Sequence, residues 1–178
     1  MKAECGRRIS VVGTSGSGKT TTASQIAHRL GIPHVELDAL HWGANWTPSP
    51  LNLFRERVSQ ALDSDAWAVD GNYSKVRDIV WGRADTLVWL DYWLPVIMWR
   101  LVQRTLWRSL LQEELWGGNH ESLVKALFSR ESILLWALQT YGRRKKEYPA
   151  LLSQPEHAHL SVVHLRSPRV TRDWLSNL

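Results

Sequence analysis

The sequence predicts an α/β fold, in which a five-stranded parallel sheet is covered by helices on both faces. The first observation is that short apolar runs alternate with segments of helical periodicity along the chain, a pattern typical of parallel sheets. The second is the run Gly-Thr-Ser-Gly-Ser-Gly-Lys-Thr at residues 13–20, between the first apolar run and the first helical segment. Strand, glycine-rich loop and helix in this order make the phosphate-binding loop of nucleoside triphosphatases, so we expect a P-loop NTPase fold.

The first elements follow one another closely. Residues 8–12 are apolar and β-branched, which favours a strand, and residues 19–30 have the apolar spacing of a helix. Residues 34–37 are the second expected strand, which ends at Asp38 and leads into a loop rich in tryptophan and proline.

The later elements continue the alternation. Ser49 or Asn52 is expected to cap the helix that follows the tryptophan-rich loop. Further strands are expected at residues 67–69, 86–90 and 160–165. Further helices are expected at residues 95–111, 121–130, 131–147 and 169–178.

The size and composition limit the class of protein. A chain of 178 residues, 44% hydrophobic and 22% charged, fits a single soluble domain over residues 1–178. Its net charge of +5 favours anionic ligands; nucleic acid is one possibility, but no nucleic-acid-binding motif supports it. No apolar run is long enough for a membrane span, so we expect a cytoplasmic protein with no membrane partner. The sequence does not predict the oligomeric state.

The glycine-rich loop has the chemistry of a phosphate site. Because glycine lacks a Cβ atom, backbone N–H groups of such a loop can surround an anion at the helix N-terminus. Lys19 is expected to reach the β- and γ-phosphate oxygens of ATP, and the Thr20 hydroxyl to bind Mg²⁺. The alternative is a Gly/Ser turn that fits the pattern without a ligand. The residues expected to bind ATP here are Gly13, Ser15, Gly16, Ser17, Gly18, Lys19, Thr20 and Thr21.

Three aspartates, Asp38, Asp70 and Asp91, directly follow apolar runs. Ligands of parallel sheets bind beyond the carboxyl ends of the strands, so Asp38 and Asp70 are expected beside the phosphate loop if their strands neighbour the first. A carboxylate there can hold Mg²⁺ through water or accept a proton from a substrate hydroxyl, or it can simply cap a turn. No apolar run ends in an Asp-Glu pair, which favours phosphate transfer over ATP hydrolysis.

Arginines form a stripe on the helix expected at residues 95–111. Arg100, Arg104 and Arg108 recur every four residues and therefore share one face. Guanidinium groups suit phosphate oxygens, so we expect this face to contact phosphate, with Arg104 the best single candidate. A solvated basic face is the alternative. A second basic cluster lies at residues 143–146.

Three longer runs carry a resemblance to a known family. They are Leu-Asp-Ala-Leu-His-Trp at residues 37–42, Val-Asp-Gly-Asn-Tyr-Ser at residues 69–74 and Glu-Leu-Trp-Gly-Gly-Asn at residues 114–119. With the phosphate loop, they make the chain similar to the adenylate-kinase-like superfamily of small P-loop kinases. Within it, the chain most resembles the bacterial DNA topology modulation (FlaR-like) proteins, over nearly its whole length.

The resemblance implies a helical LID insertion at about residues 100–145 and an acceptor-binding region at about residues 38–66. It implies that Asp38 lies at the acceptor site and that Asp70 lies near the Mg²⁺ shell. It also implies ATP contacts outside the phosphate loop, at Arg100, Arg104, Ser167 and Pro168, and at Arg143 or Arg144, where the closing arginine of the LID hinge would be. The expected catalytic residues are then Lys19, Asp38, Asp70 and Arg104, and the expected metal ligands are Thr20 and Asp70.

The acceptor region departs from the adenylate kinase pattern. Asn72-Tyr73-Ser74 follow Asp70-Gly71 where adenylate kinases have Phe-Pro-Arg, so an arginine for an acceptor phosphate is missing from its usual place and AMP is a doubtful acceptor. His41 can hydrogen-bond an acceptor or simply pack. The residues expected around the acceptor are Asp38, His41, Trp42, Gly71, Asn72, Tyr73 and Arg77.

The sequence therefore predicts an ATP- and Mg²⁺-dependent phosphotransferase that acts on a small acceptor, which the sequence does not identify: a nucleoside, a nucleotide or another small alcohol. The alternative, suggested by the basic charge and by the family resemblance, is a nucleotide-binding regulator of DNA topology with little or no phosphotransfer.

Overall fold

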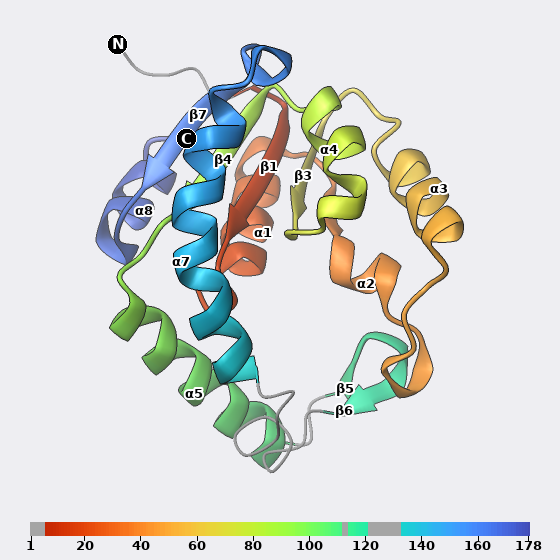
Figure 1. The fold of residues 1–178 in the computed structure, drawn as a ribbon, viewed down its shortest axis with the longest axis vertical. Helices are drawn as coiled ribbons and strands as arrows, with labels where there is room; N and C mark the ends of the chain where they lie inside the picture. The colour runs from red at the N-terminus through yellow and green to blue at the C-terminus, as the bar shows by residue number, and fades with distance from the viewer. Residues whose placement is uncertain (1–5, 112–113, 121–132) are drawn as a thin grey trace.

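A five-stranded sheet forms the centre of the molecule (Figure 1). The computed structural model describes residues 6–111, 114–120 and 133–178, so the helix expected at residues 121–130 lies outside the described residues. The strands run parallel in the order β2-β3-β1-β4-β7, which confirms the predicted sheet. Their bounds are β1 Arg8–Gly13, β2 His34–Glu36, β3 Trp67–Asp70, β4 Thr86–Leu90 and β7 Ser161–Leu165.

Helices cover both faces of the sheet, as the sequence predicts (Figure 1). On one face lie α1 (Lys19–Leu30) and α8 (Pro168–Leu175), and on the other α3 (Leu51–Ala61), α4 (Arg77–Arg83) and α7 (Ile133–Leu152). Helix α5 (Leu94–Leu110) follows β4 and contacts α7. No helix among the described residues is both long and apolar enough to cross a bilayer.

The side chains of alternate residues of the central strand β1 pack into two hydrophobic cores, one on each face of the sheet. Val11 of β1 packs with Ala23 and Ile26 of α1, and its neighbour Val12 packs with Phe54 of α3 on the opposite face. This alternation follows from the two-residue period of a strand. Because both faces are buried, β1 is apolar almost throughout.

Residues 37–41 differ from the prediction. They form the short helix α2 (Leu37–His41) rather than the end of a strand and a loop, so Asp38 lies in the first turn of a helix. The cap predicted for α3 is also wrong, because Pro50 is the N-cap residue and no side chain caps the helix. The Ser49 hydroxyl instead donates to the carbonyl oxygen of Leu40, 3.3 Å away. Helix α4 was not predicted at all.

A small hairpin also went unpredicted. Strands β5 (Glu114–Leu115) and β6 (Asn119–His120) pair antiparallel around a 3₁₀ turn at Trp116–Gly118. The hairpin lies below α2 in Figure 1 and packs against a second 3₁₀ turn at Ala44–Trp46. We call residues 42–48 the acceptor loop. The hairpin therefore joins the segment after α5 to the predicted acceptor region.

Candidate active site

The phosphate loop has the backbone that its glycines predict. Gly16 and Gly18 lie in the left-handed region, with φ of 84° and 92°, and Gly18 is the residue before α1. A Cβ atom on Gly16 would lie 2.9 Å from the carbonyl oxygen of Ile97, so glycine is required there for space as well as for conformation. The Lys19 ammonium curls back over the loop and donates to the carbonyl oxygen of Thr14 at 3.4 Å.

Asp70 links the phosphate loop to its neighbouring strands. This carboxylate is only 4% exposed; its Oδ2 accepts from the Thr20 hydroxyl at 2.7 Å, and its Oδ1 lies 2.9 Å from His34 Nε2. The contacts arise because β3 lies between β1 and β2, where Asp70 is level with Val11 and Glu36. The structure thus brings together the two residues that the sequence predicts as metal ligands, Thr20 and Asp70.

The charges around Lys19 identify the centre of the site. Burial and the guanidinium of Arg144 lower the pKa of Lys19 to about 8, with Arg104 acting in the same direction and the carboxylates of Asp38 and Asp70 opposing it. All four charged groups therefore lie near the lysine. Asp70 contacts the loop through Thr20, whereas Asp38 hydrogen-bonds with Tyr73, so a role for Asp38 at the phosphates stays a prediction.

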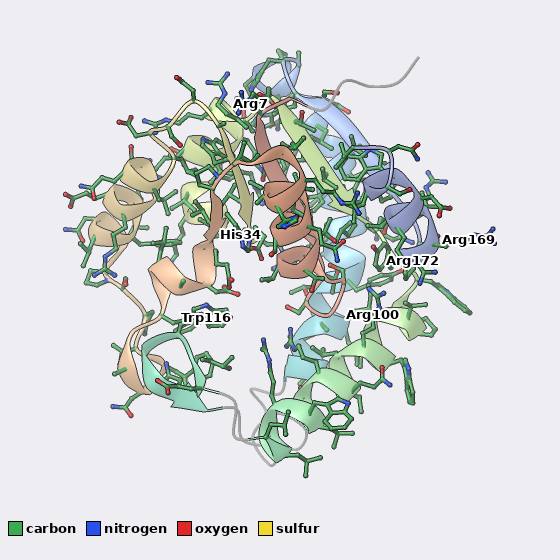
Figure 2. All side chains as sticks on the ribbon, turned by 180° about the vertical axis from the view of Figure 1, so that it is seen from behind. Arg7, His34, Arg100, Trp116, Arg169 and Arg172 are labelled. Carbon is green, nitrogen blue, oxygen red and sulfur yellow. The ribbon has the colours of Figure 1, made fainter. Side chains whose placement is uncertain are left out.

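Arginines of α5 approach the same loop. The Arg100 guanidinium donates to the carbonyl oxygen of Ser17 at 3.2 Å and lies over the ring of Tyr92; Figure 2 shows it between α5 and the start of α1. Arg104, one helical turn later, is close enough to Lys19 to affect its pKa. The part of the predicted stripe formed by Arg100 and Arg104 thus faces the phosphate loop.

Of the two alternatives at the predicted LID hinge, Arg143 and Arg144, it is Arg144 of α7 that lies near the phosphate loop. Arg143 is exposed, whereas the side chain of Arg144 is 8% exposed and lies near Lys19. Its NH1 atom is buried and no hydrogen-bond partner among the described residues reaches it. Burial lowers the pKa of this guanidinium. Because buried charges are normally paired, Arg144 has the features of an anion ligand.

The predicted acceptor residues divide into two groups. Asp38 accepts a hydrogen bond through Oδ1 from the Tyr73 hydroxyl, and burial, reinforced by Asp38, raises the pKa of Tyr73. His41 packs against the rings of Trp42, Phe54 and Tyr73 at centroid distances of 4.7–4.8 Å. Burial lowers the pKa of its imidazole. Asp38 and Tyr73 can therefore offer polar groups, whereas His41 is part of an aromatic cluster.

Asn72 and Arg77 have structural partners. The Asn72 amide accepts from the backbone N–H of Gly13 and donates to its carbonyl oxygen, and it also accepts from the Tyr148 hydroxyl at 3.0 Å. Arg77 donates to Glu147 at 2.9 Å and lies over the ring of Trp81. A small cavity of about 10 Å³ lies beside them, lined partly by Gly71 and Tyr73. It has room for about one water.

Two further predicted regions lie elsewhere. Ser167 caps α8 by accepting from the backbone N–H of Val170 at 3.3 Å, and Pro168 is the first helical residue; their contact with adenine stays a prediction. Asp91 interacts with His164 at 3.1 Å and with Lys145 at 3.9 Å. Asp91 is therefore engaged with β7 and α7.

Sequence reasoning missed His34, Glu36 and Trp116. Glu36 Oε2 accepts from the Trp116 indole at 3.2 Å, and Trp116 lies on the same side of the molecule as His34 (Figure 2). The sequence held one signal for Glu36. Glu36 and Asp38 are two residues apart and are the only charged residues in an otherwise apolar run at residues 35–40. Nothing in the local sequence indicates the contact of Glu36 with a hairpin 80 residues away.

ATP and Mg²⁺ fit the residues present. A loop of left-handed glycines and a buried guanidinium with an unpartnered NH1 atom suit an anion. A hydroxyl and a carboxylate in contact suit Mg²⁺, which prefers few protein oxygens together with substrate phosphates. Consistent with this, no group of three or more His, Cys, Asp or Glu residues within the described chain could hold a metal by itself.

Comparisons with known proteins agree with this geometry. The protein-family model for the ATPase family associated with various cellular activities (AAA) matches residues 9–79. A solved shikimate kinase from Bacteroides thetaiotaomicron superposes with a TM-score of 0.56 at 13% identity, over 96% of this chain and 95% of that chain. The fold is that of a P-loop NTPase.

Further solved structures share this P-loop fold. A shikimate kinase from Acinetobacter baumannii, in complex with shikimate, has a TM-score of 0.55 at 18% identity, over 98% of this chain and 91% of that chain. A gluconokinase from Sinorhizobium meliloti 1021 has a TM-score of 0.51 at 20% identity, over 96% and 92%. No curated protein matches the chain. At such identities the likeness concerns the fold.

Proposed function

We propose that this P-loop protein is an ATP-dependent phosphotransferase that acts on the hydroxyl group of a small molecule. The observation that carries the proposal is the position of Asp38. This carboxylate lies close enough to Lys19 to affect its pKa, yet it belongs to α2, outside the phosphate loop. A base held near the phosphate-binding lysine, where it can take the proton of an acceptor hydroxyl, is what transfer to a hydroxyl requires. The fold that the chain shares with shikimate kinases and a gluconokinase supports this choice.

In the proposed reaction, the acceptor oxygen attacks the γ-phosphorus of ATP, its proton passes to Asp38, and the bond between the γ-phosphorus and the ADP oxygen breaks. Lys19, Arg104 and Arg144 stabilise negative charge on the transferred group. Tyr73 holds the Asp38 carboxylate in place. Thr20 and Asp70 would hold Mg²⁺, which neutralises phosphate charge when bound. The helical LID at about residues 100–145, and the kinship with DNA topology modulation proteins, remain proposals.

The test separates nucleotide binding from transfer. An acceptor screen that follows ADP release identifies a substrate, and two variants are then compared with wild type. Lys19→Met is expected to lower turnover by about 100-fold or more, since it removes a charge that stabilises the transition state. Asp38→Asn is expected to lower turnover strongly while the affinity for Mg-ATP, measured by calorimetry, changes little.

Lys146→Met is the matched control, because this exposed lysine of α7 contributes nothing to the proposed site. Near-normal turnover in Lys19→Met contradicts the proposal. Fast ADP release without any acceptor indicates an ATPase instead. Salt-dependent, specific DNA binding without transfer favours the regulatory alternative.

A further inference from the structure

Three carboxylates crowd together on the acceptor side of the site. Glu36 ends β2, Asp38 follows in the first turn of α2, and Asp70 lies level with Glu36 on the adjacent strand β3. Burial raises the pKa of Glu36, and the negative charges of Asp70 and Asp38 raise it further. The three groups are therefore close enough to interact, although His34, which contacts Asp70, acts on the pKa of Glu36 in the opposite direction.

Two of these carboxylates are fixed by aromatic donors. The Trp116 indole holds Oε2 of Glu36, and the Tyr73 hydroxyl holds Oδ1 of Asp38. Within residues 6–111, 114–120 and 133–178, no donor reaches Oε1 of Glu36 or Oδ2 of Asp38. Each carboxylate thus keeps one oxygen at a defined position. A carboxylate oxygen accepts hydrogen bonds, so its natural partners are hydroxyl or ammonium groups.

The arginines nearest the acceptor region already have partners. Arg77 donates to Glu147 at 2.9 Å, and Arg55 binds Asp78 through two nitrogens, at 2.9 and 2.6 Å. Arg57 donates to the carbonyl oxygen of Leu40 and to the Ser49 hydroxyl. A phosphate or carboxylate on the acceptor would have to displace one of these partners.

Among the described residues, four further cations bear on the site. Arg100, Arg104 and Arg144 lie by the phosphate loop, where the proposed function uses their charge for the triphosphate. Lys75 affects the pKa of His41, but it is exposed, so water and salt screen its charge.

We infer that the acceptor is an uncharged or positively charged polyhydroxy compound, such as a sugar, a nucleoside or an amino sugar, and carries neither phosphate nor carboxylate. This inference rests on the proposed phosphotransfer. It follows from complementarity: an anionic acceptor would lie against the carboxylates of Glu36 and Asp38, and like-charge contacts of this kind disfavour a partner strongly. A polyol meets the two fixed oxygens with hydroxyl groups, and an ammonium group adds charge attraction.

The test compares acceptors that share a hydroxyl skeleton and differ in charge. The pairs are adenosine and AMP, ribose and ribose 5-phosphate, and glucosamine and glucuronate, each offered to the full-length protein with Mg-ATP while ADP release is followed. One pair is expected to increase ADP release. For that pair, kcat/KM of the uncharged or cationic member is expected to exceed that of the anionic member by about tenfold or more.

Two variants test the role of the charges. Glu36→Gln keeps an oxygen for the Trp116 indole but removes a negative charge, so the preference within the pair is expected to shrink. Glu147→Gln weakens the hold on Arg77 and is expected to raise kcat/KM of the anionic member. A purely structural effect of either substitution would change both members alike, and that result overturns the charge argument.

The outcomes separate the two proposals. A wild-type preference for the anionic member overturns this inference and leaves the phosphotransferase standing. ADP release that no acceptor increases overturns both.

Discussion

Some residues of this site lower the stability of the ligand-free fold, because their buried charges are placed to meet an anion. Lys19 is the clearest case, because burial and the Arg144 guanidinium disfavour its charged form in the folded chain. Arg144 is itself buried with an unpartnered NH1 atom. Two buried cations close to each other destabilise a fold; the carboxylates of Asp38 and Asp70 offset part of that cost for Lys19, and a bound triphosphate would offset more.

At this scale we predict that Lys19→Met stabilises the ligand-free protein. The folded-state pKa of Lys19, about 8, lies below its ordinary value of 10.5, so protonation favours the unfolded chain. The penalty is fully present below pH 8 and disappears as the pH rises toward 10.5. Urea unfolding at pH 7 should show the variant more stable by about 1–3 kcal/mol, with a smaller difference at pH 9.5. An equal difference at both pH values would contradict the assigned cause.

At the scale of elements, the hairpin β5–β6 holds the acceptor loop. The buried amide of Asn119 donates to the carbonyl oxygen of Gly43 at 2.9 Å and accepts from the backbone N–H of Trp46 at 2.9 Å. Asn45 and Trp46 both have positive φ, at 55° and 54°, a conformation that side chains other than glycine adopt only when their surroundings hold them there. The hairpin provides that restraint.

Two neighbouring glycines of the hairpin offer a matched test. Gly117 and Gly118 have similar φ angles of 70° and 75°, so alanine strains both backbones by about 1 kcal/mol. Only at Gly117 would a Cβ atom meet backbone of the acceptor loop, 2.7 Å from the carbonyl carbon of Gly43. Gly117→Ala should therefore destabilise the protein by about 1–3 kcal/mol more than Gly118→Ala.

Urea unfolding measures the two variants, and hydrogen exchange locates the effect. Faster exchange at residues 42–48 is expected in Gly117→Ala and not in Gly118→Ala. Equal exchange in both variants would mean that the hairpin does not restrain the acceptor loop.

At the scale of the whole molecule, the sequence predicted what depends on local pattern. The parallel sheet and the phosphate loop follow from apolar periodicity and from a dense glycine motif. The choice between Arg143 and Arg144 could not be made from the sequence, because the part of α7 that faces the site depends on how the helix packs. The contact of Asp70 with His34 depends in turn on the strand order.

Ligand binding should stabilise the whole fold. The proposed site draws on β1, β3, α1, α2, α5 and α7, and a ligand that binds only the folded chain shifts the unfolding equilibrium by mass action. Mg-ADP at about 100 times its Kd should raise the free energy of unfolding by about 2.7 kcal/mol. Urea titrations with and without Mg-ADP measure this, and Lys19→Met should reduce the gain at the same concentration. No gain in wild type would contradict nucleotide binding.

The bond between Tyr148 and Asn72 has a consequence for synthesis on the ribosome. Asn72 braces the first glycine of the phosphate loop, and Tyr148 of α7 completes the hydrogen bonds of that amide. A nascent chain that has not yet released residue 148 lacks this brace, although its glycine loop was translated long before. We therefore expect the phosphate loop to gain its full support only after residue 148 has been released, and a prematurely terminated fragment would lack that support.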